Sequence, residues 1–234
     1  MYYPMYFDPT YILVLAGVVI SMMASAKMRS TFQRYSRVRS RSGMTGREAA
    51  ERLLRSQGIY DVRVEHVSGS LTDHFDPRNK VLRLSDATYN SASVAAIGVA
   101  AHECGHAVQH AKGYTPLSIR SALVPVVNFG SAVSWPLIFA GLLINSRSAV
   151  MMLNLGILAF SLSILFQIVT LPVEFNASNR ALRILGDTGM LYPDEVRDTR
   201  KVLTAAALTY VAGAAAAILQ LLRLLLITNS RRRD

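Results

Sequence analysis

Residues 94–111 read VAAIGVAAHECGHAVQHA, a run of small and apolar residues that leads into two histidines four positions apart. Ser91 or Ser93 can cap a helix over this stretch, because a serine hydroxyl accepts a hydrogen bond from a free amide of the first turn. In such a helix His102 and His106 lie on one face, about 6 Å apart along the axis. Both imidazoles can then bind one ion at about 2.0–2.1 Å, so the stretch predicts a metal-binding helix.

Glu103 follows the first histidine and completes the pattern His-Glu-x-x-His. A carboxylate at this place can take a proton from an attacking water and pass it to a leaving amine, which is the chemistry of zinc peptidases. A chance match is the alternative, since short patterns recur by accident. Polar side chains on so apolar a helix would carry a desolvation cost without a partner, however. We therefore expect one Zn²⁺ per chain, bound by His102 and His106, with Glu103 as the general base.

A third protein ligand is needed, and the candidates close to the motif do not suit the role. His110 lies about 12 Å from His102 along the helix axis, too far to share one tetrahedral ion. Cys104 lies two residues from each histidine and points roughly 160° away from both, so we expect it to pack rather than bind. The extended motif with a third histidine is excluded, because Gln109 and Lys112 stand where that motif needs a glycine and a histidine.

Glu174 is the preferred third ligand among the downstream carboxylates. It follows Pro172, which suits the first turn of a new helix. The competitor Asp187 stands in a glycine-flanked stretch that suits a turn better. The residues three, four and seven positions after Glu174 are small, which would let its helix press against the motif helix and deliver the carboxylate: Ala177, Ser178 and Ala181.

The composition indicates an integral membrane protein. Of the 234 residues 51% are hydrophobic and 17% are charged, and the mean hydropathy is +0.29. A bilayer core of about 30 Å needs about 20 mostly apolar helical residues. Four stretches meet this need and predict four transmembrane helices: 11–28, 122–144, 149–171 and about 203–227.

The distribution of lysine and arginine predicts the orientation of these helices. Residues 1–26 contain none, whereas 27–120 contain fifteen, nine of them between Lys27 and Arg55. Under the positive-inside rule the amino terminus lies outside and the motif faces the cytoplasm. Two spans separate the motif from Glu174, so both lie on one side. The basic tail 231–233 would lie outside, against the rule, and Arg223 would snorkel towards that surface.

The topology divides the chain into five parts. They are the amino-terminal segment with the first span (1–28), a cytosolic part with the motif helix (29–121), a transmembrane hairpin (122–171), a cytosolic segment with Glu174 (172–202) and the last span with its basic tail (203–234). Within the cytosolic part we expect a helix over 45–57, strands over 62–67 and 81–84, and turns over 68–78.

Neither nucleic acid nor a disulfide is expected. The net charge of +10 is concentrated beside the first span, where it sets membrane orientation. Nucleic-acid binding would favour aromatic residues among the cations, yet only Phe32 and Tyr35 lie between Lys27 and Arg55. Cys104 is the single cysteine, which is compatible with a reducing compartment. The expected partners are the lipid bilayer and a protein or peptide substrate.

Four segments together resemble the YugP-like neutral zinc metallopeptidases of bacterial membranes, and the likeness covers nearly the whole chain. More distantly the chain is similar to the HtpX-type membrane proteases, which implies a setting in membrane-protein quality control. In those relatives an aspartate usually follows the ligand glutamate by four residues, whereas this chain has Ser178. The segments that carry the resemblance are 74–78 (HFDPR), 84–85 (LS), 100–109 (AAHECGHAVQ) and 172–181 (PVEFNASNRA).

The resemblance implies a zinc-dependent endopeptidase with a mainly α fold: four transmembrane helices and a small α+β, zincin-like cytosolic part of the glutamate type. It also suggests that an edge strand beside the catalytic helix pairs with the extended substrate, and Val81, Leu82, Arg83 and Leu84 are the candidates. Possible stabilisers of the transition state are His74, Arg180 and Tyr210, each of which has an ordinary structural role as its alternative.

Three other hypotheses remain beside a membrane-anchored peptidase. An intramembrane protease would carry the motif within a span, but 91–101 is too short to cross. A non-catalytic scaffold could hold zinc structurally, although it would have no need of Glu103. A basic, membrane-attached nucleic-acid binder would bind in a salt-dependent way. The sequence selects neither a substrate nor an oligomeric state.

Overall fold

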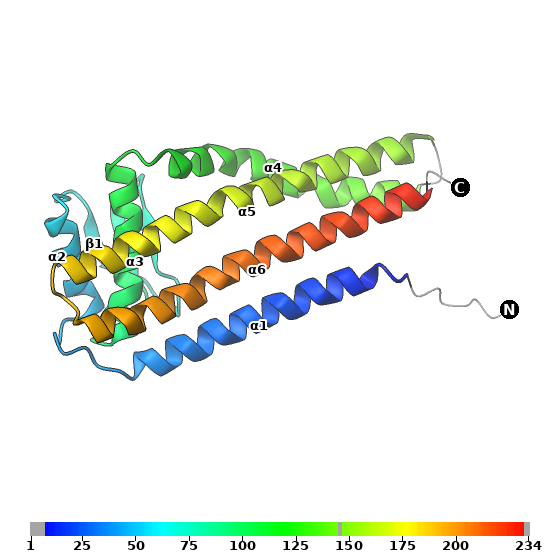
Figure 1. Cartoon of the computed structure of the whole chain (residues 1–234). Helices are drawn as coiled ribbons and strands as arrows, with labels where there is room; N and C mark the ends of the chain where they lie inside the picture. Colours follow the sequence, from blue (N-terminus) through cyan, green and yellow to red (C-terminus); the bar gives the residue numbers. More distant parts are fainter. Residues whose placement is uncertain (1–7, 145–146, 232–234) are drawn as a thin grey trace. The chain divides into compact units, whose positions relative to one another are not determined.

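The computed structural model describes residues 8–144 and 147–231 (Figure 1). By its internal contacts the chain divides into two compact units. One contains the described parts of 1–24, 120–169 and 210–234, and the other contains 25–119 and 170–209. The basic tail 231–233 falls largely outside the described residues.

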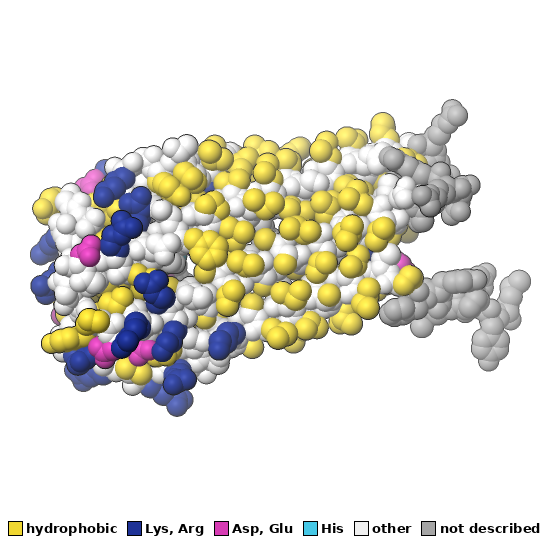
Figure 2. All heavy atoms as spheres, viewed as in Figure 1, with side chains coloured by type: hydrophobic (Ala, Val, Ile, Leu, Met, Phe, Trp, Pro, Cys, Tyr) yellow, Lys and Arg dark blue, Asp and Glu magenta, His cyan; other side chains and the backbone are white. Residues whose placement is uncertain are grey.

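Four helices are long and apolar enough to cross a membrane. They are α1 (Tyr11–Ser36), α4 (Thr115–Leu143), α5 (Arg147–Asp187) and α6 (Pro193–Arg231). Each contains one of the four expected spans, and hydrophobic side chains cover the visible face of these helices in Figure 2. The mainly helical, membrane-type fold with a small sheet is therefore confirmed.

The helices extend well beyond the apolar stretches. α5 has 41 residues, which is about 60 Å and about twice the thickness of the hydrocarbon core. Its continuity corrects one expectation, because Pro172 lies inside α5 rather than in the first turn of a new helix. Proline is tolerated inside a membrane helix where neighbouring groups satisfy the carbonyl that loses its partner. The segment with Glu174 is thus a direct extension of the third span.

Small residues bring the membrane helices together. A Cβ on Gly156 of α5 would lie 2.7 Å from Ile138 of α4, and Gly17 of α1 approaches Ala216 of α6 to 3.2 Å. This approach is typical of helices in lipid, where packing drives association. Arg223 of α6 lies 3.7 Å from the Asp8 carboxylate, so this arginine is paired within the chain.

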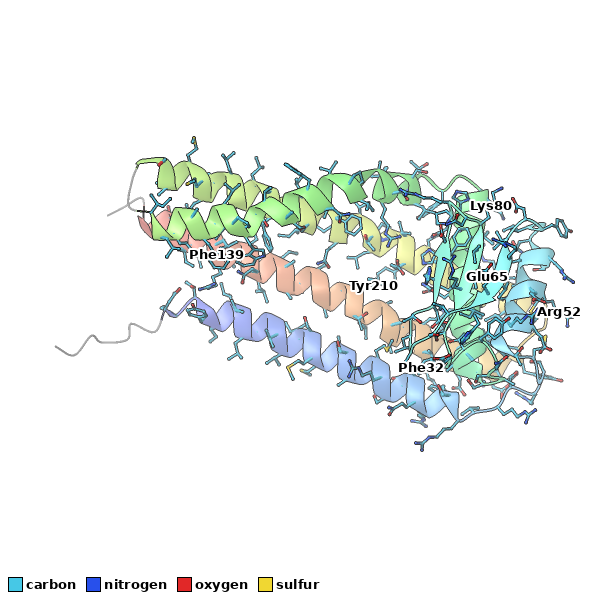
Figure 3. The ribbon with its side chains drawn as sticks, turned by 180° about the vertical axis from the view of Figure 1, so that it is seen from behind. Phe32, Arg52, Glu65, Lys80, Phe139 and Tyr210 are labelled. Carbon is cyan, nitrogen blue, oxygen red and sulfur yellow. The ribbon has the colours of Figure 1, made fainter. Side chains whose placement is uncertain are left out.

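The second unit holds a small sheet and two shorter helices. The strands are β1 (Arg63–His66), β2 (His74–Asp76) and β3 (Val81–Leu84), and the helices are α2 (Gly46–Ser56) and α3 (Val94–Ala111). α2 begins at the capping box of Thr45 and Glu48, and Ser93 caps α3. Figure 3 labels Arg52 of α2 and Glu65 of β1.

The order of the strands contradicts the proposed role of Val81, Leu82, Arg83 and Leu84. β3 is the central strand, parallel to β1 and antiparallel to β2, so both of its edges are already hydrogen-bonded. An extended substrate needs a strand with a free edge, and therefore cannot pair with β3. The prediction was wrong because β2 was not expected, so β3 was taken for an edge strand. β2 lies in the stretch 68–78, whose glycine, aspartate and proline residues indicate turns.

α3 is buried along most of its length and touches two other helices through glycines. A Cβ on Gly98 would lie 2.7 Å from the Thr199 side chain of α6. A Cβ on Gly105 would lie 2.5 Å from the backbone oxygen of Ala177 on α5. Because a backbone atom cannot rotate away, α3 and α5 can be this close only with glycine at position 105.

The substitution Gly105→Ala is expected to lower the stability of the protein by about 1–3 kcal/mol through overpacking. Gly186→Ala is the matched control, because Gly186 lies near the end of α5 with nothing within 4 Å of a new Cβ. Thermal unfolding in detergent, with a chelator present so that metal binding does not contribute, should show a lower Tm only for Gly105→Ala. Equal Tm values for the two variants would contradict the close approach.

Candidate metal centre

Three side chains from α3 and α5 bring their ligand atoms together. Those of His102, His106 and Glu174 all lie within 4.8 Å of one another. Oε2 of Glu174 is 3.3 Å from Nε2 of His102 and 3.6 Å from Nε2 of His106. Two ligands at about 2.0–2.1 Å from one tetrahedral ion are separated by about 3.3 Å. The spacing of these atoms therefore matches the spacing that zinc needs.

The other ring nitrogens are held by neighbours. Nδ1 of His102 lies 3.1 Å from the hydroxyl of Ser178, and Nδ1 of His106 lies 3.0 Å from Oε1 of Gln109. Such outer contacts fix the orientation of metal-binding histidines. Ser178 follows Glu174 by four residues, and its hydroxyl reaches the histidine from the same helix.

Gln109 determines which nitrogen of His106 carries the proton. The fully buried amide donates through Nε2 to the backbone oxygen of Val173 at 2.8 Å and to Oδ1 of Asn176 at 3.0 Å. Its Oε1 is therefore the acceptor, and Nδ1 of His106 must be the donor. In the neutral imidazole, Nε2 then presents a lone pair towards Glu174.

The cluster lacks positive charge at its centre. Oε2 of Glu174 is buried and has no hydrogen-bond partner of normal geometry among the described residues. Burial opposes charging of His106, but the carboxylates of Glu174 and Glu103 outweigh it and raise the pKa of this imidazole. The same electrostatic demand can be met by a cation, and two imidazole nitrogens with a carboxylate form a typical zinc donor set.

The side chains of Glu103 and Cys104 differ in their hydrogen bonding. Glu103 is 9% exposed, and its carboxylate forms no hydrogen bond or ion pair with any described residue. Cys104 is buried with its sulfur 3.6 Å from the backbone oxygen of Ala50. Burial raises the pKa of the Cys104 thiol, which keeps it protonated and a poor metal ligand. Of these two residues, Glu103 is thus the one whose side chain has free hydrogen-bonding capacity.

The remaining candidates do not join the cluster. His110 is exposed at the end of α3 and contacts the ring of Phe75 at 5.9 Å. His74 is exposed, and its Nδ1 lies 2.8 Å from the backbone oxygen of Thr72. Asp187 is the last residue of α5 and is not part of the ligand group.

Arg180 also lies outside the ligand group. Nε of Arg180 donates to Asn176 at 2.7 Å, so Arg180 is connected to His106 only through Asn176 and Gln109. Tyr210 belongs to the unit of the membrane helices. Among the described residues neither His74 nor Arg180 forms a hydrogen bond or ion pair with Glu174 or the two histidines.

Gln109 and Asn176 are the residues that sequence reasoning missed. Gln109 was used to exclude the extended motif, but no contact with His106 was predicted for it. Its position three residues after His106 places it on the same face of the helix, which was an available signal. Asn176 gave no signal, because its contact with Gln109 depends on how α5 meets α3.

Comparison with known proteins assigns the chain to one family. Residues 10–229 match the family described as "Putative neutral zinc metallopeptidase". The chain is also 46% identical over 215 residues to the "Putative membrane protease YugP" of Bacillus subtilis (strain 168), which covers 92% of this chain and 94% of that protein. No solved structure shows a significant match.

The substitution Gln109→Leu is expected to weaken zinc binding by about 10–100-fold, because His106 loses the acceptor that fixes its tautomer. Equilibrium dialysis of the purified protein against Zn²⁺ would measure this change without relying on activity. Gln33→Leu, an exposed position on α1, is the matched control and should bind as the wild type does. Unchanged affinity in a folded Gln109→Leu protein would show that the contact does not orient the ligand.

Proposed function

The chain belongs to the neutral zinc metallopeptidase family, and we propose that it is a membrane-anchored endopeptidase with one Zn²⁺ held by His102, His106 and Glu174. A single observation carries the proposal. Three donor atoms at zinc-compatible distances converge from two helices, with the unpaired carboxylate of Glu103 adjacent to one of them. A donor set of two histidines and one glutamate is characteristic of catalytic rather than structural zinc, because it leaves a coordination position open.

In the proposed mechanism the residues of the chain position the reactants and move the proton. When bound, zinc supplies a Lewis acid that lowers the pKa of a water and polarises a carbonyl. Glu103 takes the proton of the attacking water and delivers it to the leaving nitrogen. Gln109 and Ser178 hold the two imidazoles in place while Glu103 acts. Glu103 is largely buried, which keeps its carboxylate free of competing hydrogen bonds.

An intramembrane site is disfavoured by the position of α3. This helix is not among the four candidate spans of the described residues. Its apolar residues instead pack in a core with α2, β3 and the ends of α5 and α6. We therefore propose a site at the cytoplasmic surface of the membrane, in agreement with the fifteen Lys and Arg residues of 27–120. Protein quality control in that membrane is the setting that we propose.

Glu103→Gln should retain zinc and lose at least about a hundredfold in activity, because the general base is removed while the ligands remain. Glu174→Ala should lose most of its bound zinc. The measurements are metal content and cleavage of an unfolded protein substrate by purified protein. Glu51→Gln, a partly exposed position on α2 paired with Arg47, is the control and should change neither.

Three outcomes of this experiment would decide against the proposal. Full activity of Glu103→Gln would remove the peptidase mechanism. Unchanged zinc in Glu174→Ala would remove this residue as a ligand. A protein that binds zinc but cleaves nothing, in the wild type as well as the variants, would favour the non-catalytic scaffold.

Lys112→Cys should react with a membrane-impermeant maleimide only after cells are permeabilised, because the exposed end of α3 faces the cytoplasm in this proposal. The wild type is a suitable control, since its single cysteine, Cys104, is buried. Labelling in intact cells would place the motif outside. Absence of labelling in both states would favour an intramembrane site.

A further inference from the structure

A cavity of about 370 Å³ lies between the end of α1 and the start of α6. Its lining comes from residues 27–35 of α1 and 200–208 of α6, all within the unit that holds the metal centre. It is separate from the histidine cluster, because none of its lining residues is a candidate ligand. Its size falls within the range of about 300–1,000 Å³ that is typical of small-molecule sites.

The charge of the lining is uniformly positive. The lining contains no carboxylate and four cations, which are Lys27, Arg34, Arg200 and Lys201. Lys201 lies 2.8 Å from Asp198, but the other three cations form no ion pair with any described residue. Figure 2 shows Lys and Arg side chains gathered over this end of α1 and α6. Uncompensated cations around one cavity favour an anionic ligand.

The rest of the lining is uncharged and consists of Thr31, Tyr35, Thr204, Ala205 and Leu208. Tyr35 stands between cations, with its ring centre 5.7 Å from the guanidinium of Arg34 and 5.7 Å from the amine of Lys201. Ala205 and Leu208 form the wall on α6, and Leu208 is largely exposed. The ligand therefore has to offer an anionic group at one end and hydrocarbon at the other.

The cavity lies where the apolar part of α1 ends and its first positively charged residues begin. Residues 11–26 of α1 contain no Lys or Arg, and Lys27 is the first cation of the chain. Lysine and arginine at such a boundary attract the anionic headgroups of the cytoplasmic leaflet. A soluble anion would gain nothing from the exposed side chain of Leu208, whereas an acyl chain would cover it.

We propose that this cavity binds the headgroup of an anionic phospholipid, with an acyl chain lying along Ala205 and Leu208. The phosphate is held by Lys27, Arg34 and Arg200. This site is independent of zinc and of peptide hydrolysis. Basic pockets between membrane helices are known to recognise lipid headgroups in this way.

The lipid site is connected to the helix of the metal centre through a small core. Phe32 and Tyr35 of α1 pack with Ala95 of α3 and Val202 of α6. Figure 3 labels Phe32 at this end of α1. A ligand that draws α1 and α6 together would stabilise this packing, because binding to the folded state alone raises the free energy of unfolding.

The experiment uses the full chain in detergent with phosphatidylglycerol, phosphatidylethanolamine or glycerol 3-phosphate added in turn. Native mass spectrometry counts bound lipid, and thermal unfolding measures the shift in Tm. Phosphatidylglycerol should bind at one per chain and raise Tm, and phosphatidylethanolamine should bind at least tenfold more weakly. The double variant Arg34→Gln/Arg200→Gln should lose about tenfold or more in affinity for phosphatidylglycerol.

Arg52→Gln/Arg55→Gln is the matched control, since it removes the same charge from exposed positions on α2. It should bind phosphatidylglycerol as the wild type does. Both cavity arginines are exposed, so without lipid the double variant should have the Tm of the wild type. If the double variant does not fold, Lys27→Gln is the second variant, and it should also bind phosphatidylglycerol more weakly than the wild type. Three results would overturn the proposal. The two phospholipids could bind with equal affinity, or the two double variants could lose the same affinity for phosphatidylglycerol. Glycerol 3-phosphate could also bind as tightly as phosphatidylglycerol.

Discussion

The contact between the backbones of α3 and α5 at Gly105 and Ala177 is the constraint on which the metal centre depends. A Cβ at position 105 would lie 2.5 Å from the Ala177 oxygen, so the two helices are as close as backbones allow. This approach lets the short side chain of Glu174 reach the nitrogens of His102 and His106. A larger residue at position 105 would separate the carboxylate from the histidines.

The same approach allows α5 to orient the histidines. Gln109 of α3 reaches the Val173 oxygen and Asn176, and through them it fixes the tautomer of His106. Ser178 performs the corresponding role for His102. Both ring orientations thus depend on residues within four positions of Glu174. The extension of α5 beyond its membrane span supplies the third donor, the outer contact of His102 and the two groups that hold Gln109 in place.

Much of this arrangement follows from local chemistry that the sequence displays. The bounds of α3 are those predicted, since Ser93 and the small apolar residues determine them locally. The capping box of α2 was also predictable from Thr45 and Glu48. What failed depended on distant partners. The position of β3 in the sheet depends on β2, whose residues have the composition of a turn, and Pro172 is accommodated in a helix that its surroundings support.

The central claim is that two imidazoles and one carboxylate hold zinc in this protein, without sulfur. X-ray absorption spectroscopy at the zinc edge of the purified, zinc-loaded protein tests it most directly. The account predicts a first shell of nitrogen and oxygen only, at about 2.0–2.1 Å, with outer-shell scattering from two imidazoles. A sulfur at about 2.3 Å would instead assign Cys104 to the metal and contradict the account.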